Sequence, residues 1–224
     1  METQVAGGIG RPEAAERIRS DRHRIGSEGH GSGGGPREPA RPLFLGNHKV
    51  FHNRDAARFL VREILPLVRA QVPDATLDIV GKDAESLGGW TRADGVRVLG
   101  YVPHLEDALA RAAVFVAPHR FAAGVQTKVV QALAAGTPVV TTPLEREGLT
   151  PIPADLLRVG ETAPEIAAQV LDLIRNPAAA AELGARGREW ARARFQWEFS
   201  VRAFEAAAAR VAMRHELRDA PVIA

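Results

Sequence analysis

The 224-residue chain contains no cysteine, which excludes disulfides, thiolate nucleophiles and zinc–thiolate sites. No apolar run approaches the length of a membrane span, and no signal-peptide hydrophobic segment follows Met1. One tyrosine and a formal net charge of +2, with arginine spread along the chain, argue against nucleic-acid binding. We therefore expect a cytoplasmic protein that has no integral membrane segment and binds no nucleic acid.

Patterns that bind metals or hydrolyse glycosides are missing too. The chain has no Asp-x-Asp motif. His48 and His52 are four residues apart, but they precede the predicted helix and no third ligand is evident. No pair of carboxylates suits glycoside hydrolysis. We expect neither a metal ion nor a bound cofactor.

Residues 1–40 differ in composition from the rest of the chain. They hold nine of the 21 glycines and no Phe, Tyr or Trp, and charged residues surround the stretch GHGSGGG. Such a segment cannot bury enough apolar surface to offset the entropy of ordering it. We predict a disordered tail over 1–40, a folded domain over 41–215 and a short C-terminal tail over 216–224.

From Arg41 onward, short apolar runs alternate with helical patterns. The runs predict strands at 42–46, 76–81, 96–100, 114–118, 138–142 and 156–159. Apolar residues at helical spacing predict one helix after an N-cap at Asn53 and another that begins near Gly124. Further helices are predicted over 104–112, 165–175, 178–194 and 198–214. Because the strands are continuously apolar and alternate with helices, the predicted fold class is α/β, a Rossmann-like doubly wound parallel sheet.

In such a sheet, ligands bind beside the carboxyl ends of the strands. Three of the predicted strands end in a glycine, at Gly46, Gly81 and Gly100. Glycine lets a backbone come close to a ligand, but any tight turn after a strand also uses it. Both interpretations stay open for each of the three glycines.

The stretch GVQTKVVQALAAGTPVVTT, residues 124–142, contains the most informative helix. Its start offers free N–H groups and a helix dipole to an anion, and Lys128 adds a positive charge one turn later. Gln131 follows on the same face and can both donate and accept hydrogen bonds. The helix is otherwise apolar and should be buried, where a lysine needs a partner. Lys128 either binds phosphate or extends along the sheet edge into water.

Four stretches, which together cover most of the chain outside the tail, have a distinctive order and spacing. They are FLGN…FHNRDAARFLVREILPLVRAQVPDATLDIVG (44–81), VRVLGYVPHLEDALARAAVFVAP (96–118), GVQTKVVQALAAGTPVVTT (124–142) and FQWE (195–198). Through them the chain resembles the C-terminal, donor-binding half of a GT-B glycosyltransferase. It is most similar to the retaining group 1 enzymes of family 4.

The resemblance implies a nucleotide-sugar donor bound against the loops at the carboxyl ends of the strands. The loop after the third strand would contact the base, through Gly100, Tyr101 and Val102. The opening of the helix would hold the diphosphate, at Gly124, Val125, Gln126, Thr127 and Lys128. Further phosphate contacts are implied nearby, at Gly46, Lys49 and Lys82. Solvated basic side chains would explain the two added lysines equally well.

The family usually places two glutamates eight residues apart across this helix, the first touching the donor sugar and the second the ribose. Here Ala123 and Gln131 occupy these positions. A branch of the family lacks the first glutamate and carries a GxQxK pattern, which residues 124–128 match. Gln131 can hydrogen-bond a ribose, but an amide is a weaker partner than a carboxylate. Glu145 and Glu147 lie in a loop that the family places near the donor, and we predict both to be solvated.

The resemblance thus implies a hexosyltransferase that transfers sugar from a nucleotide diphosphate, with retention, to an acceptor that the sequence does not identify. It assigns no catalytic residue. A second domain binds the acceptor in GT-B enzymes, so we expect a separate acceptor-binding subunit, or a homo-oligomer formed through helix 198–214. A partner could also hold the chain at the inner membrane surface. Two alternatives stay open: a nucleotide-sugar binding module without transfer activity, and a truncated, degenerate enzyme.

Overall fold

The computed structural model describes residues 37–121 and 127–195, all of which belong to one compact unit. Several predicted features lie outside these residues. They are most of the N-terminal tail, the helix over 198–214, the tail over 216–224, and Gly124, Val125 and Gln126 at the start of the phosphate-binding helix.

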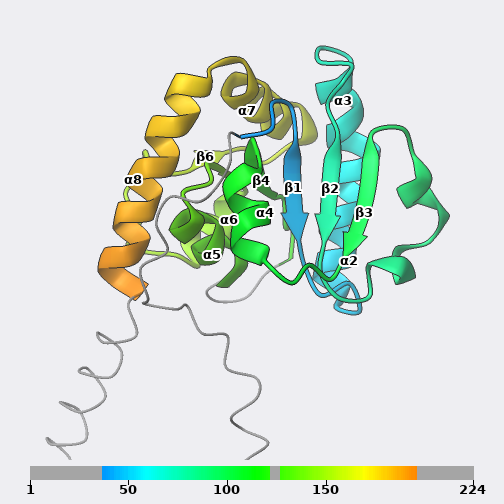
Figure 1. Ribbon diagram of the computed structural model, residues 1–224, viewed down its shortest axis with the longest axis horizontal. Helices are drawn as coiled ribbons and strands as arrows, with labels where there is room; N and C mark the ends of the chain where they lie inside the picture. The colour runs from blue at the N-terminus through cyan, green and yellow to red at the C-terminus, as the bar shows by residue number, and fades with distance from the viewer. Residues whose placement is uncertain (1–36, 122–126, 196–224) are drawn as a thin grey trace, which may run out of the picture. The chain divides into compact units, whose positions relative to one another are not determined.

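Six parallel strands form one sheet within the described residues (Figure 1). The strands are β1 (Pro42–Leu45), β2 (Leu77–Val80), β3 (Val96–Gly100), β4 (Val114–Ala117), β5 (Val139–Thr141) and β6 (Arg158–Val159). Their order is β3-β2-β1-β4-β5-β6, and each neighbouring pair is parallel. The sequence prediction of a Rossmann-like parallel sheet is confirmed. The strand order reverses between β1 and β4, which is where such sheets bind ligands.

The helices connect the strands in the predicted places. They are α2 (Phe51–Phe59), the π-helical turn η1 (Leu60–Ile64), α3 (Leu65–Arg69), the 3₁₀ turns η2 (Ala84–Leu87) and η3 (Gly89–Arg92), α4 (Leu105–Arg111), α5 (Thr127–Ala135), α6 (Pro143–Glu147), α7 (Ala163–Arg175) and α8 (Pro177–Phe195). The short helix α6 was not predicted, nor were the two 3₁₀ turns, which lie in a stretch that was expected to be a polar loop. None of the helices among the described residues is both long enough and apolar enough to cross a lipid bilayer.

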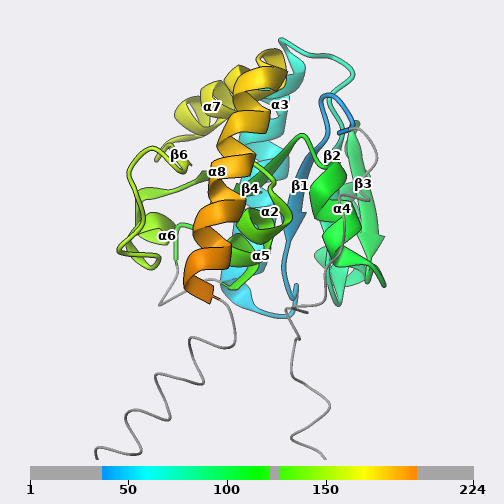
Figure 2. The ribbon, with the colours of Figure 1, turned by 60° about the vertical axis from the view of Figure 1, so that its left-hand side comes forward.

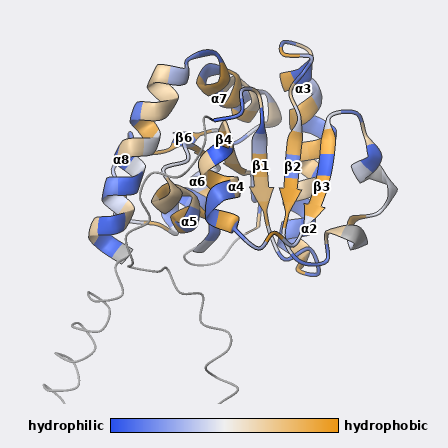
Figure 3. Ribbon diagram, viewed as in Figure 1, coloured by the Kyte–Doolittle hydropathy of each residue, from blue (hydrophilic) through white to orange (hydrophobic). Residues whose placement is uncertain are grey.

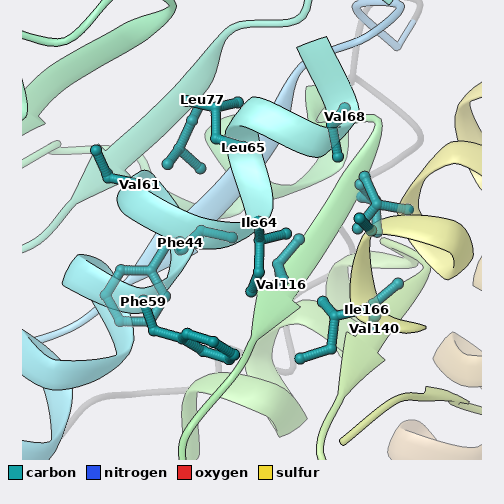
Figure 4. Packing of buried hydrophobic residues seen from close by; sticks show 14 of the residues in the cluster. Phe44, Phe59, Val61, Ile64, Leu65, Val68, Leu77, Val116, Val140 and Ile166 are labelled. Atoms are coloured by element: carbon teal, nitrogen blue, oxygen red, sulfur yellow. The ribbon is translucent and has the colours of Figure 1, made fainter. Parts of the chain in front are cut away.

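Two hydrophobic cores lie on opposite faces of the sheet. On one face, side chains from α2, η1, α3 and α7 pack on Phe44, Val116 and Val140 (Figure 4). On the other, side chains from α4, α5 and α8 pack on Leu43 and Phe115, and α8 runs across α5 (Figure 2). The hydropathy colouring follows this arrangement, since β2 is strongly hydrophobic while α8 alternates hydrophilic and hydrophobic stretches (Figure 3). Strands buried on both faces explain the continuous apolar runs in the sequence.

The last residues of the predicted tail belong to the fold. The N–H of Glu38 donates to the carbonyl of Arg111 at 2.8 Å, and the carbonyl of Ala40 accepts from Thr76 at 3.0 Å. The Arg37 guanidinium donates to the carbonyl of Gly136, just beyond the end of α5. The prediction that disorder extends to residue 40 is therefore wrong for 37–40. The polar composition of residues 37–40 gives no sign in the sequence that they hydrogen-bond to other parts of the fold.

Gly81, at the end of β2, gives a direct test of the loop packing. Its φ is +126°, and a Cβ there would lie 1.9 Å from the carbonyl oxygen of Gly46. We predict that Gly81→Ala lowers the free energy of unfolding by about 2–4 kcal/mol, because it adds both backbone strain and a clash. Urea denaturation measures the change.

Gly89→Ala is the matched control, because a Cβ at Gly89 meets nothing within 4 Å. Equal stability of the two variants would contradict the close approach of the loops after β1 and β2.

Candidate functional site

The candidate site lies at the carboxyl ends of β1, β4 and β5, beside the point where the strand order reverses. Three connections meet there: the loop from β1 into α2, the segment after β4 that leads to α5, and the turn from β5 into α6. One buried polar side chain from each connection, or from the helix that follows it, joins a group centred on Lys128. We call Lys128, Asn53, His119 and Glu145 the Lys128 cluster.

Lys128 lies in the first turn of α5, and only 8% of its surface is exposed. Its ammonium group donates a hydrogen bond to Asn53 Oδ1 at 2.5 Å. The same Nζ lies 2.8 Å from His119 Nε2. The interpretation that Lys128 extends into water is therefore wrong. The lysine points inward, toward the end of β1, and its partners come from α2 and from the residues after β4.

His119 connects the lysine to a carboxylate. Its side chain is fully buried, and its Nδ1 lies 2.7 Å from Glu145 Oε1. Glu145 is itself only 1% exposed, so the prediction that it is a solvated loop residue is wrong. The unpredicted helix α6 turns Glu145 inward, whereas Glu147 at the end of the same helix is exposed, as predicted.

A lysine ammonium can only donate hydrogen bonds, so the His119 nitrogen that faces Lys128 must accept. That leaves the imidazole proton on Nδ1, facing Glu145. This assignment accounts for every short contact in the Lys128 cluster with a donor on one side and an acceptor on the other. It also accounts for the 3.1 Å separation of His119 Nε2 and Asn53 Oδ1, since both accept from the same ammonium group.

Asn53 joins the Lys128 cluster to the loop after β1. Its Nδ2 donates to the carbonyl of Asn47 at 2.9 Å. A Cβ at Gly46 would lie 3.0 Å from Asn53 Cβ, so glycine leaves room for the asparagine. The predicted N-cap role of Asn53 is wrong, because α2 begins two residues earlier with Val50 as its N-cap. Asn53 is instead a buried residue on the inner side of the helix.

Burial and the neighbouring charges shift the pKa values of the titratable groups in the site. Burial lowers the pKa of Lys128 to about 8, and the charge of Glu145 opposes this shift. Burial also lowers the pKa of His119, although its hydrogen bond to Glu145 acts in the other direction. The pKa of His52, whose ring lies 5.8 Å from that of His119, is lowered by burial and by Lys128. Near neutral pH the site therefore carries a charged lysine and two neutral histidines.

The other predicted contact residues surround this cluster at the surface. Lys49 is exposed and pairs with Asp83 at 3.1 Å, and Lys82 is exposed. Tyr101, after β3, is 70% exposed, next to Gly100 with its φ of +64°. The remaining described residues of the predicted site are Val102, which is half-buried, Thr127, which is exposed, and Gln131, which is half-buried.

Sequence reasoning missed Asn53, His119 and Glu145 as parts of the site. A signal existed for Asn53, which stands at helical spacing from the buried residues Ala56 and Leu60 and so shares their face. A histidine after a buried strand was a weaker sign. A signal existed for Glu145 as well, because Thr142-Pro143-Leu144-Glu145 has the T-x-x-E pattern of a helix start and places Glu145 in the first turn of α6.

The sequence of residues 40–176 matches the family described as "Glycosyl transferases group 1". The chain belongs to this family. Comparison with curated protein sequences gives no match. The family predicted from the sequence motifs is confirmed, and the matched residues contain all four members of the Lys128 cluster.

Solved structures of glycosyltransferases share the fold. TarM from S. aureus, crystallised as a point mutant with fondaparinux, α-GlcNAc-glycerol and UDP, matches with a TM-score of 0.67 and 16% identity over 79% of this chain and 37% of its own. Sucrose-phosphate synthase from Thermosynechococcus elongatus matches with a TM-score of 0.64 and 24% identity over 80% of this chain and 47% of its own. Anabaena HepE in complex with UDP-glucose matches with a TM-score of 0.64 and 14% identity over 77% of this chain and 49% of its own. This group 1 chain thus spans less than half of each and has the fold of one half of a GT-B enzyme.

The lowered pKa of Lys128 predicts a distinctive pH dependence of stability. The ordinary lysine pKa is 10.5, so between about pH 8 and that value the unfolded chain binds more protons than the native protein. The free energy of unfolding should therefore rise with pH through this window, by up to about 3 kcal/mol. Lys128→Met should lack this rise.

Urea denaturation at intervals from pH 7.5 to pH 10 measures this rise in the free energy of unfolding. Lys82→Met, which removes an exposed lysine, is the control and should show the same rise as the native protein. Parallel pH curves for the native protein and Lys128→Met would contradict the burial of the charge.

Proposed function

We propose that this chain binds the donor of a retaining group 1 glycosyltransferase, with the donor diphosphate on the opening of α5 and against Lys128. The observation that supports this most is a buried, charged lysine at the switch point of a doubly wound parallel sheet. Burying an ammonium group is costly, and a sheet of this kind binds anionic ligands at that edge. A donor phosphate beside Lys128 would stabilise the buried ammonium group with an opposite charge.

The contacts of Lys128 leave room for such a ligand. A lysine ammonium has three hydrogen-bond donors, and Asn53 and His119 take two of them within the described residues. The third can reach a phosphate oxygen. As the sugar leaves, negative charge grows on the diphosphate, and a fixed positive charge in a site that excludes water stabilises it strongly. The contribution of Lys128 to transfer is then electrostatic.

The surrounding residues suit the rest of a nucleotide sugar. The exposed ring of Tyr101, after β3, offers a surface for the base, together with Gly100 and Val102. Gln131, half-buried one turn beyond Lys128, can hydrogen-bond the ribose. Lys49 and Lys82 add positive charge at the rim. The sugar acceptor would be bound by a second domain or subunit.

A second candidate function is a nucleotide-sugar binding module that does not transfer sugar. The amide of Gln131 and the methyl group of Ala123 favour it, because both replace carboxylates that the resemblance leads one to expect. The two functions share the donor site and differ in turnover. Release of free nucleotide diphosphate from a nucleotide sugar, with the acceptor-binding partner present, separates them.

Thermal unfolding of the full chain with excess UDP, GDP or ADP tests donor binding. UDP is the first probe, because TarM and HepE have been crystallised with uridine nucleotides. At about a hundred times its dissociation constant, a nucleotide should add about 2.7 kcal/mol to stability, or roughly 5–10 °C in Tm. Lys128→Met should lose most of this shift.

Arg111→Ala is the matched control, since it removes an exposed positive charge at the end of α4, by the opposite edge of the sheet. Each variant is compared with its own Tm without nucleotide. A full shift in Lys128→Met, or no shift with any of the three nucleotides, would overturn the proposal.

A further inference from the structure

Glu145 is a buried carboxylate that pairs with a histidine ring. It is 1% exposed, its Oε1 lies 2.7 Å from His119 Nδ1, and its Oε2 has no hydrogen-bond partner among the described residues. Removing a carboxylate from water with so few hydrogen bonds is unfavourable unless a positive charge lies near. Lys128 supplies such a charge, because its ammonium group lies at the other nitrogen of the His119 ring and interacts electrostatically with Glu145.

His119 links the two charges through its two nitrogens. Nδ1 faces Glu145 and Nε2 faces the Lys128 ammonium at 2.8 Å, so the ring is held from both sides. A carboxylate at Nδ1 favours the tautomer with its proton on Nδ1, which leaves Nε2 free to accept from the lysine. The opposite tautomer would place an N–H against the ammonium group, two donors facing each other.

The backbone around His119 holds this arrangement in place. The hydroxyl of Thr142, at the end of β5, donates to the carbonyl of His119 at 2.8 Å. Thr142 also caps α6, where its side chain accepts from the N–H of Glu145 at 3.4 Å. One threonine thus positions both the histidine and the carboxylate relative to β4 and β5.

We propose that Glu145 is a positioning residue for the donor site: through His119 it keeps Lys128 charged and holds its ammonium group in place between Asn53 and His119. The consequence for phosphate binding rests on the proposed function. The coupling between Glu145 and Lys128 can be measured without any ligand.

The other groups that face Lys128 cannot take over this role. From α2 come Asn53, which is neutral, and His52, whose charge would repel the lysine. The segment after β4 provides His119, which is neutral near pH 7, and α6 provides Glu145. Glu145 is the group whose charge raises the pKa of Lys128.

The chain offers an unusually clear test, because it contains only three lysines, Lys49, Lys82 and Lys128. Labelling lysine with ¹³C at Cε gives one NMR signal for each, and a pH titration reports Lys128 directly in the full chain. In the native protein its pKa should be about 8. Glu145→Gln keeps the shape of the side chain and removes the charge, so the pKa of Lys128 should fall below that value.

Two further variants complete this test. Glu147→Gln removes an exposed carboxylate from the same helix and should leave the Lys128 titration unchanged. Glu145→Asp keeps the negative charge but moves it farther from His119 and Lys128. The pKa of Lys128 in this variant should therefore lie between its values in the native protein and in Glu145→Gln. If Glu145→Gln fails to fold, the Lys128 titration of Glu145→Asp tests the coupling in its place. An unchanged Lys128 pKa in Glu145→Gln and Glu145→Asp would overturn the proposal.

Calorimetric titration with UDP at pH 7 and pH 9 tests the consequence for the donor site. The native protein should lose affinity at pH 9, roughly tenfold for each pH unit above the Lys128 pKa if only the charged lysine binds. In Glu145→Gln the loss should begin at lower pH. A shifted NMR titration with no UDP binding by the native protein would overturn the proposed function and leave the coupling intact. UDP affinity that is equal in both proteins at both pH values would overturn the role of Glu145 in binding.

Discussion

The hydrogen bonds of the buried Lys128 ammonium group organise the part of the structure at the carboxyl ends of the strands. An isolated buried charge is unfavourable, so its surroundings must supply hydrogen bonds and an opposite charge. Three chain segments do so, with Asn53 from α2, His119 from the end of β4 and Glu145 from α6. In a doubly wound sheet, ligands bind beside segments at this edge, and we propose that the same contacts prepare an anion site.

Close backbone packing makes this convergence possible. The loops after β1 and β2 approach until Gly81 touches the carbonyl of Gly46, and Gly46 in turn lies against Asn53. On the other side, Thr141 and Thr142 use their hydroxyls to bind the carbonyls of Ala117 and His119. The small and hydroxylated residues at the strand ends thus fix the positions from which the charged side chains reach each other.

The sheet could be predicted from the sequence because its central strands β1, β4 and β5 are buried on both faces and carry almost only apolar side chains. The family could also be recognised, from motifs that span most of the sheet. The partners of Lys128 could not be predicted, because they come from residues 9 to 75 positions away and depend on tertiary packing. Asn53 has the character of a helix cap and Glu145 that of a surface loop, and in both cases burial overrides the local preference.

The most direct test of the account is the pKa of Lys128, measured by ¹³Cε NMR in the absence and presence of saturating UDP. A ligand that binds the charged lysine must raise its pKa, by thermodynamic linkage. We predict a clear rise from about 8 on addition of UDP. If UDP binds and the pKa of Lys128 stays where it was, the buried lysine serves the fold and the donor phosphate lies elsewhere.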